Sequence, residues 1–266
     1  MQFSPDEIRG AVRDRYRAAV EADDQASQCC GPEANDSSCC GPQQSQSKGG
    51  CGAGYTAEQL SALPSGADLG LGCGNPALAA EFASGETVLD LGSGAGVDVF
   101  LAARAVGPTG RAIGVDMTEE MVAKARSNAR EAGLQNVEFL SGEIEALPVS
   151  DNSVDVIISN CVVNLSPEKA RVFAEAYRVL KPGGRLAISD IVAIGPISDQ
   201  QRADMDLYGA CISGAEPADV VMGLLKDAGF DQVRVDLANQ QFSWDEVEAL
   251  GRPVASAILR GVKPAQ

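Results

Sequence analysis

The sequence predicts an α/β fold, in which a doubly wound, mostly parallel sheet is covered by helices. From residue 86 onward, short apolar runs alternate with segments of helical periodicity, and the connections between them are short. A glycine-rich turn follows the first apolar run and leads into a helical segment. The chain has 266 residues, of which 45% are apolar, so it can form one large domain or two small ones around a sizeable core.

The amino-terminal segment is predicted to form a helix over residues 4–22. Ser4 and Glu7 have the spacing of a capping box, and Pro5 stands at the first helical position. Apolar side chains then recur every four residues, at Ile8, Val12, Tyr16 and Val20.

Residues 23–54 have a different composition, rich in Ser, Gln, Gly and Cys. A ten-residue repeat places Cys-Cys-Gly-Pro at residues 29–32 and again at residues 39–42. The segment has too few large apolar residues to offset the entropy lost on ordering, so we expect a mobile arm. A short helix is predicted from Thr56, followed by a turn-rich segment at 66–76 that contains Cys73 between two glycines.

The rest of the chain alternates predicted strands and helices. The strands cover residues 87–91, 111–115, 137–140, 154–159, 185–189, 232–237 and 255–260. The helices cover residues 97–106, 119–132, 167–180, 199–210 and 217–228. Seven strands with these connections predict the doubly wound arrangement.

Composition excludes several classes of function. The chain has 37 Asp and Glu against 21 Lys and Arg, a net charge of −16, and no histidine. A body this acidic repels a phosphate backbone, and no window supplies a basic stripe, so we expect no nucleic-acid partner. Without histidine, the chain lacks the commonest general base near neutral pH and every imidazole-based zinc site or hydrolase dyad. Its chemistry must depend on carboxylates, thiols, amides or a cofactor.

Targeting signals and membrane spans are also missing from the sequence. The amino end has neither a basic region nor an apolar stretch typical of a signal peptide, and no apolar run approaches the roughly 18 residues that a membrane span needs. We therefore expect a cytoplasmic protein with no membrane partner. Eight cysteines in such a chain favour thiol chemistry or ligation over a structural disulfide framework.

The glycine-rich turn is the first candidate binding site. It has the spacing G-x-G-x-G, with Asp90 two residues before Gly92, whereas a dinucleotide fingerprint reads G-x-G-x-x-G. A carboxylate in this turn suits an ammonium group better than a phosphate. Asp116 ends the second strand, where a carboxylate can accept hydrogen bonds from both ribose hydroxyls. Glu143 and Ile144 follow the third strand, where an acid and a flat apolar side chain could flank an adenine.

These features, together with Lys-Pro-Gly-Gly at residues 181–184, resemble the class I S-adenosylmethionine-dependent methyltransferases over residues 86–190. The resemblance implies a Rossmann-like sheet of seven strands whose last strand is antiparallel. It implies S-adenosylmethionine (SAM) as cofactor, bound by Asp90, Gly92, Ser93, Gly94, Gly96, Asp116, Met117, Glu143, Ile144 and Asn160. It also divides the chain into a helix and Cys-rich arm at 1–54, a cofactor-binding domain at 55–240 and a segment at 241–266 that completes the sheet.

Three cysteines lie in segments that are predicted to meet at the carboxyl edge of the sheet, where open α/β folds bind ligands. They are Cys73 in Leu-Gly-Cys-Gly-Asn-Pro, Cys161 in Ser-Asn-Cys-Val-Val-Asn-Leu and Cys211 in Gly-Ala-Cys-Ile-Ser-Gly-Ala. From residue 55 onward, the chain resembles the arsenite SAM methyltransferases. That resemblance implies that Cys73, Cys161 and Cys211 hold trivalent arsenic, and that arsenite and methylarsenite are methylated in arsenic detoxification.

The amino-acid composition of this chain suits the chemistry of trivalent arsenic. Trivalent arsenic is soft and trigonal, so three thiolates form a neutral pyramidal site that leaves its lone pair exposed. That lone pair can attack a methyl carbon without a general base, which is consistent with the absence of histidine. Methyl transfer oxidises arsenic formally to the pentavalent state, so a further round needs electrons from thiols, with thioredoxin or glutathione as the expected source. We expect the enzyme to be a monomer.

Other interpretations stay open at this point. Each cysteine taken singly is also consistent with a small buried apolar residue. A zinc site normally has four ligands and close pairs such as C-x-x-C, which this chain lacks. The same sheet suits a methyltransferase for a small lipid-like or quinone-like acceptor, and a metalloid-binding protein without turnover is a further alternative.

Some positions depart from the family or stay undecided. Many members have an aromatic residue two positions before the first arsenic-binding cysteine, where this chain has Leu71. The family also tends to have one more functional cysteine upstream, and the sequence does not choose among Cys29, Cys30, Cys39, Cys40 and Cys51 for redox work or arsenic delivery. The repeats that contain four of them are also consistent with a low-complexity tail. Trp244 and Phe242 are candidates for a lid or core anchor, and Asp204 and Asp206 are expected on the solvated surface.

Overall fold

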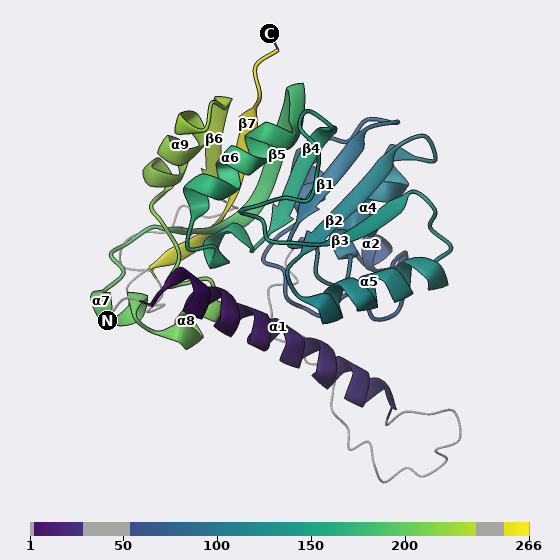
Figure 1. The fold of residues 1–266 in the computed structure, drawn as a ribbon, viewed down its shortest axis with the longest axis horizontal. Helices are drawn as coiled ribbons and strands as arrows, with labels where there is room; N and C mark the ends of the chain where they lie inside the picture. The colour runs from purple at the N-terminus through teal and green to yellow at the C-terminus, as the bar shows by residue number, and fades with distance from the viewer. Residues whose placement is uncertain (1–2, 29–53, 238–252, 266) are drawn as a thin grey trace.

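A computed structural model describes residues 3–28, 54–237 and 253–265 (Figure 1). Its centre is a seven-stranded sheet with the order β3-β2-β1-β4-β5-β7-β6. The strands are β1 (Thr87–Leu91), β2 (Arg111–Asp116), β3 (Val137–Ser141), β4 (Val154–Asn160), β5 (Leu180–Ala193), β6 (Asp231–Leu237) and β7 (Val254–Val262). β7 pairs antiparallel with both β5 and β6, while the pairings among β1 to β5 are parallel. The predicted doubly wound sheet with an antiparallel last strand is confirmed.

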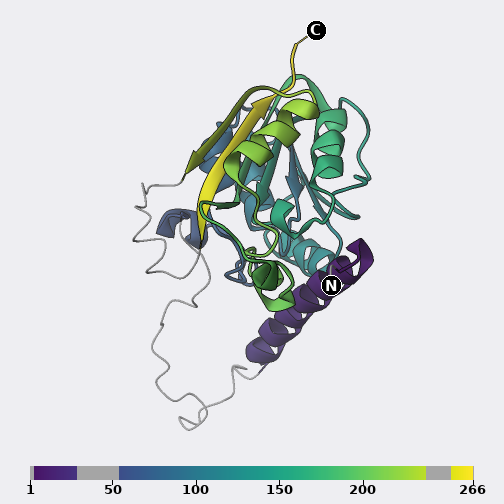
Figure 2. The same ribbon diagram turned by 90° about the vertical axis from the view of Figure 1, so that its left-hand side faces the viewer.

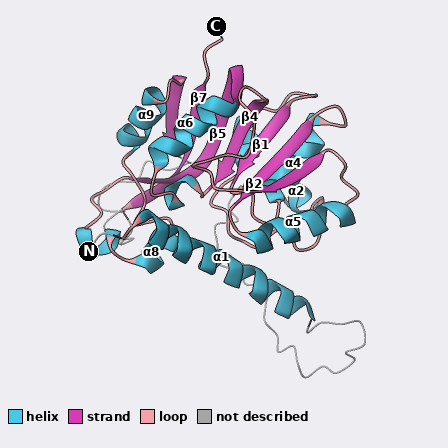
Figure 3. Cartoon of the chain, viewed as in Figure 1, coloured by secondary structure: helices cyan, strands magenta, loops and turns pink. Residues whose placement is uncertain are grey.

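The helices connect and cover these strands (Figure 3). They are α1 (Pro5–Gln28), α2 (Ala57–Ser61), α3 (Pro76–Ala80), α4 (Val97–Val106), α5 (Glu119–Glu131), α6 (Lys169–Val179), α7 (Asp199–Arg202), α8 (Met205–Gly209) and α9 (Ala218–Asp227), with a 3-10 turn η1 (Val163–Leu165) after β4. In the part of the chain that the structure describes, none of them combines the length and the apolarity that crossing a membrane requires.

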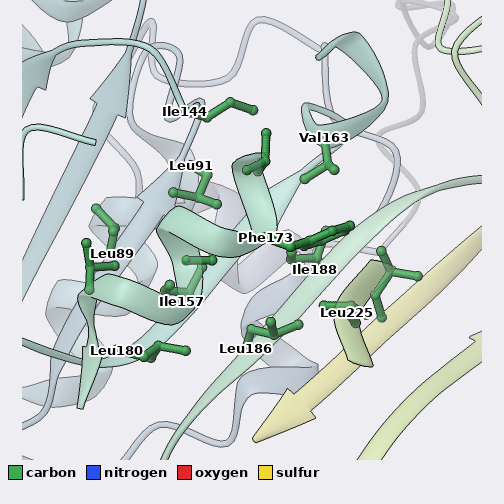
Figure 4. Packing of buried hydrophobic residues seen from close by; sticks show 14 of the residues in the cluster. Leu89, Leu91, Ile144, Ile157, Val163, Phe173, Leu180, Leu186, Ile188 and Leu225 are labelled. Atoms are coloured by element: carbon green, nitrogen blue, oxygen red, sulfur yellow. The ribbon is translucent and has the colours of Figure 1, made fainter. Parts of the chain in front are cut away.

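The core has two layers, one on each face of the sheet. Alternate residues of a strand enter opposite layers, because side chains of a strand point to opposite faces. In β4, Ile157 packs in the layer that α6 and α9 cover, whereas Val156 and Ile158 pack in the layer that α4 and α5 cover. Figure 4 shows the first layer, in which Phe173 of α6 lies among strand residues such as Ile188. These layers hold the carboxyl ends of the strands in a fixed arrangement, which is what the functional site needs.

Helix α1 lies across the end of the sheet instead of on one of its faces (Figures 1 and 2). It packs against α5, α8 and η1, elements that follow different strands. The predicted helix ended at residue 22, and residues 23–28 were assigned to the mobile arm. That assignment was wrong, because the helix continues through Gln28, and Asp23 and Asp24 form ion pairs with Lys124 of α5 at 2.9 and 2.6 Å.

Two further predicted elements differ from the structure. The single helix predicted over residues 199–210 is two short helices, because the side chain of Asp204 accepts hydrogen bonds from the amides of Asp206 and Leu207 and starts α8. Asp204 is therefore a helix cap as well as a surface residue. The strand predicted at 185–189 is longer, since β5 pairs with β7 from Arg185 to Ala193. The other predicted strands and helices lie within one or two residues of the observed ones.

Candidate active site

The site lies where the strand order changes direction, between β1 and β4. Chain connections leave these two neighbouring strands toward opposite sides of the sheet, and the resulting crevice at their carboxyl ends is the usual ligand site of such folds. A pocket opens there, lined by the ends of β1, β2 and β4, by residues 67–69, 71 and 72, and by α1. The space among its lining residues amounts to about 1020 Å³, part of which is open solvent.

The glycine-rich turn forms one wall of the pocket. Gly92, Gly94 and Gly96 have φ values of 72°, 52° and 104°, a region that side chains other than glycine rarely adopt. A Cβ atom on Gly92 would collide with the side chain of Val162, and one on Gly96 would lie 2.8 Å from Phe100. The turn therefore needs glycine both for its backbone shape and for the close approach of neighbouring side chains.

Two carboxylates predicted for the cofactor site lie beside this turn. Oδ2 of Asp116 accepts a hydrogen bond from the amide of Gly94 at 2.9 Å, and its Oδ1 accepts one from the amide of Thr118 at 2.8 Å. Asp90 is buried, and its Oδ1 has no hydrogen-bond partner among the described residues. Burial, followed by the charges of Asp98 and Asp116, holds the pKa of Asp90 well above its usual range. An unpaired carboxylate oxygen here suits a ligand that carries a positive charge or donates a hydrogen bond.

The predicted cofactor residues are divided between two hollows, except Gly96, which lines neither of them. Ser93, Met117, Ile144 and Asn160 line the main pocket with Asp90, Gly92, Gly94 and Asp116. Glu143 faces a neighbouring, more open hollow, where it forms an ion pair with Arg13 of α1 at 3.6 Å. Glu145, which the sequence reasoning did not select, lines the main pocket in its place and accepts a hydrogen bond from Ser166 at 2.6 Å.

The three predicted cysteines come together in one buried cluster. Cys73 and Cys161 form a disulfide, with their Cα atoms 5.8 Å apart, although 88 residues separate them in the chain. Sγ of Cys211 donates to the carbonyl oxygen of Cys161 at 3.5 Å. All three are at most 7% exposed. Cys161 and Cys211 also have left-handed backbones, with φ values of 58° and 61°, which are uncommon for residues with a side chain and are concentrated at functional sites.

The loop around Cys73 is held by Asn160. Oδ1 of Asn160 accepts a hydrogen bond from the amide of Cys73 at 3.0 Å, and its Nδ2 donates to the carbonyl of Gly74 at 2.8 Å. Gly72 allows this contact, because a Cβ atom there would lie 2.8 Å from Nδ2. Asn160 was predicted to bind the cofactor; it lines the pocket, but its hydrogen bonds also position the first cysteine.

Asp190 joins the cysteine cluster, and sequence reasoning missed it. One ligand atom each from Cys161, Asp190 and Cys211 lies within 4.8 Å of the others. Oδ1 and Oδ2 of Asp190 accept hydrogen bonds from the amides of Ile191 and Asn164, and burial raises its pKa to about 6. The signal was available, since Asp190 directly follows the predicted strand 185–189 and therefore lies toward the carboxyl edge.

Asp98 and Tyr55 are two more pocket residues that sequence reasoning did not select. Asp98 lies in the first turn of α4 and is buried. The hydroxyl of Tyr55 donates to its Oδ2 at 2.8 Å. No motif marks either residue, because the pair forms across 43 positions of the chain.

Helix α1 covers both parts of the site. Its residues Ile8 and Val12 pack in the same buried cluster as the three cysteines, and Arg9, Val12 and Tyr16 line the main pocket. Arg9 forms ion pairs with Glu168 and, at 3.5 Å, with Glu145. The apolar face predicted for this helix therefore covers part of the site. The remaining candidates, Cys29, Cys30, Cys39, Cys40, Cys51, Phe242 and Trp244, lie outside the described residues.

Comparisons with known proteins agree with this geometry. A family described as methyltransferase domain matches residues 82–248. The arsenite methyltransferase of Halobacterium salinarum is 48% identical over 269 residues, which cover 98% of this chain and 68% of that protein. A crystal structure of an arsenic (III) S-adenosylmethionine methyltransferase from Chlamydomonas reinhardtii is 33% identical, with a TM-score of 0.60 over 79% of this chain and 70% of that one.

Quinone-modifying enzymes are related over a shorter stretch. A demethylmenaquinone methyltransferase of Listeria welshimeri is 41% identical over 85 residues, 32% of this chain and 36% of that protein. The match to the Halobacterium protein, by contrast, includes the region of all three cysteines, because it covers nearly the whole chain.

Proposed function

The chain belongs to the arsenite methyltransferase family, and we propose that it transfers methyl groups from SAM to trivalent arsenic held by Cys73, Cys161 and Cys211. The observation that carries this proposal is the convergence of three cysteines from distant segments beside the pocket at the β1–β4 crevice. Structural packing does not require three cysteines at one place, whereas a soft trivalent ion does.

The cofactor pocket fits SAM by the chemistry of its lining. Oδ1 of Asp90 and the hydroxyl of Ser93 have no hydrogen-bond partner among the described residues, so they can bond to a polar, positively charged ligand. Asp116 would receive the ribose, and Ile144 and Met117 would pack against the adenine. When bound there, SAM supplies an electrophilic methyl group attached to a positively charged sulfur. Val12 and Tyr16 of α1 line the pocket and would limit the access of water to the bound cofactor.

Arsenic capture is a ligand exchange that the three thiols would carry out in their reduced form. Arsenous acid loses its three hydroxyl groups as water, each taking the proton of one thiol, and three As–S bonds form. The product is neutral, so it can lie in a buried, largely apolar cluster that includes Val12 and Leu165. Capture requires the bond between Cys73 and Cys161 to be open.

The cysteines would leave the arsenic lone pair available to the methyl carbon. As the As–C bond forms, the C–S bond breaks and its electrons stay on the sulfur, which becomes a neutral thioether. No proton leaves the nucleophile, so positioning is the main task of the protein. The left-handed backbones of Cys161 and Cys211 support such a role, because unfavourable backbone conformations cluster at sites that must hold a side chain in a fixed position.

Reduction would complete the cycle. Methyl transfer would leave arsenic formally pentavalent, in a positively charged species that keeps three As–S bonds. Two of the thiolates would then leave together as a disulfide and return two electrons to arsenic, and a water molecule would bind the trivalent arsenic in their place and lose a proton. The adjacency of Cys73 and Cys161 supports these residues as such a pair. A small dithiol protein of the thioredoxin type, or glutathione, would then reduce the disulfide by thiol exchange.

A product assay tests the function directly. The full chain is incubated with arsenite, SAM and a thiol reductant, after which the arsenic species are separated and S-adenosylhomocysteine (SAH) is measured. Methylated arsenic together with SAH is the expected result. Arsenic binding without methylated product would indicate a sequestering protein. SAH formed from a quinol but not from arsenite would indicate a relative of the quinone-modifying enzymes.

A further inference from the structure

The side chain of Asp98 has one satisfied and one unsatisfied oxygen, both buried. Oδ2 accepts hydrogen bonds from the hydroxyl of Tyr55 at 2.8 Å and from Nδ2 of Asn160 at 3.3 Å. Oδ1 has no hydrogen-bond partner among the described residues, and the side chain is 5% exposed. Leaving a buried carboxylate oxygen unpaired is costly, so a donor from outside the chain is expected there.

Asp90 has the same property and lines the same pocket. Neither carboxylate takes part in an ion pair with a Lys or Arg side chain of the described chain. Two buried carboxylates without a basic partner repel each other, and the charge of each disfavours ionisation of the other. A ligand group that brings a positive charge and several N–H donors would relieve both effects.

The methionine part of SAM carries two positive groups, and only one of them fits this requirement. The sulfonium has a charge but no hydrogen to donate, whereas the α-ammonium group has a charge and three N–H donors. An ammonium group is already expected at Asp90. Resting on the proposed function, we propose that Asp98 is a second carboxylate that receives the α-ammonium group of the cofactor, through its unpaired Oδ1. Tyr55 and Asn160 position the Asp98 carboxylate for this contact.

Tyr55 is suited to that positioning task. Its hydroxyl donates to Asp98 and accepts a hydrogen bond from Nδ2 of Asn160 at 2.8 Å, so its orientation is determined at both ends. Burial, followed by the charge of Asp98, raises the pKa of Tyr55, which keeps the hydroxyl protonated as a donor. The aromatic ring also lines the pocket.

Binding of two nucleosides to the full chain tests the inference without any turnover. SAH carries the α-ammonium group and is chemically stable, while methylthioadenosine has the same nucleoside and thioether but no amino-acid part. Their dissociation constants are measured by calorimetry for the wild type, Asp98→Asn and Tyr55→Phe. The matched control is Asp219→Asn, because Asp219 also lies in the first turn of a helix but is exposed.

We expect Asp98→Asn to weaken SAH binding by about tenfold or more and to leave methylthioadenosine binding within about twofold, since a hydrogen bond to a charged group contributes about 1.5–3 kcal/mol. Tyr55→Phe should give a smaller loss with the same selectivity, and Asp219→Asn should match the wild type. Equal losses for both nucleosides, or no loss for either, would overturn the inference while leaving the proposed function intact.

Two further results distinguish a failure of the Asp98 proposal from a failure of the proposed function. If Asp98→Asn does not fold, Tyr55→Phe decides, because its selectivity between the two nucleosides is predicted independently. A wild-type chain that binds neither nucleoside would contradict the proposed function, and the inference with it.

Discussion

The amide nitrogen of Cys73 donates a hydrogen bond to Oδ1 of Asn160 at 3.0 Å, across 87 residues of the chain. Because Asn160 precedes Cys161, this bond ties the loop of the first cysteine to the strand end that carries the second. The same side chain contacts Tyr55 and Asp98 through Nδ2, so one residue links the thiol cluster to the main pocket.

Replacement of that residue should weaken arsenic binding. Asn160→Ala leaves the Cys73 amide and the Gly74 carbonyl without their side-chain partner, so the loop should lose its fixed position. We expect the dissociation constant for arsenite, measured by calorimetry on reduced protein without cofactor, to rise by about tenfold. An unchanged constant would show that the loop is held by other contacts.

Each cysteine of the cluster should be needed for methylation. Cys161→Ser or Cys211→Ser leaves arsenic with two thiolates. In metal sites, losing a residue that only supports a ligand already lowers metal affinity or activity by about 10- to 100-fold. We therefore expect the first methylation to fall by more than about a hundredfold, measured as methylarsenic formed per minute. With excess reductant, Cys30→Ser serves as the control and should stay near the wild-type rate. A wild-type rate in either cluster variant would refute the three-thiolate site.

Cofactor affinity should depend on pH through Asp98. Burial raises the pKa of Asp98 to about 6. The polar and charged groups around Asp98 and the neighbouring Asp90 are Tyr55, Asn160 and Asp116. An ammonium group favours the ionised carboxylate, so binding of SAH releases the proton. The contribution of Asp98 to the affinity should therefore rise as pH increases through about 6 and level off above about 7.

The slope of that profile separates Asp98 from other groups. In Asp98→Asn the rise should be shallower, and the remaining slope should come from Asp90, whose pKa is also raised by burial. Calorimetric titrations with SAH at roughly pH 5, 6 and 8 would measure it. Identical profiles in the wild type and the variant would contradict the assignment.

Helix α1 should limit access to the thiols. Val12 is 2% exposed and packs in the cluster that contains Cys73, Cys161 and Cys211. Val12→Ala removes part of this cover and should destabilise the helix contact by about 1–3 kcal/mol. Alkylation of Cys211 in reduced protein, followed by peptide mass spectrometry, should become about 5- to 150-fold faster if it occurs when α1 detaches. Asp14→Ala, an exposed change on the same helix, should have no such effect. Equal rates in all three proteins would mean that access does not depend on α1.

Much of the fold was predictable because its signals are local. Gly92, Gly94 and Gly96 mark the turn, and the apolar runs of β1 and β4 mark buried strands, so the strand order follows from general rules for such sheets. The errors also have local causes. The helix predicted over 199–210 was interrupted by the capping side chain of Asp204, and α1 was extended beyond its own sequence signals by contacts of Asp23 and Asp24 with Lys124.

The sequence by itself determined the residue types of the site: three cysteines in distinctive segments, carboxylates at strand ends, and no histidine. Only the tertiary structure decided that Asp98 faces Tyr55, that Asp190 joins Cys161 and Cys211, and that Glu145 replaces Glu143 in the pocket. These relationships join positions far apart in the chain, so they depend on strand register and on the path of α1. A local pattern specifies which residue can bind a ligand, but packing across the sheet decides which residues share a site.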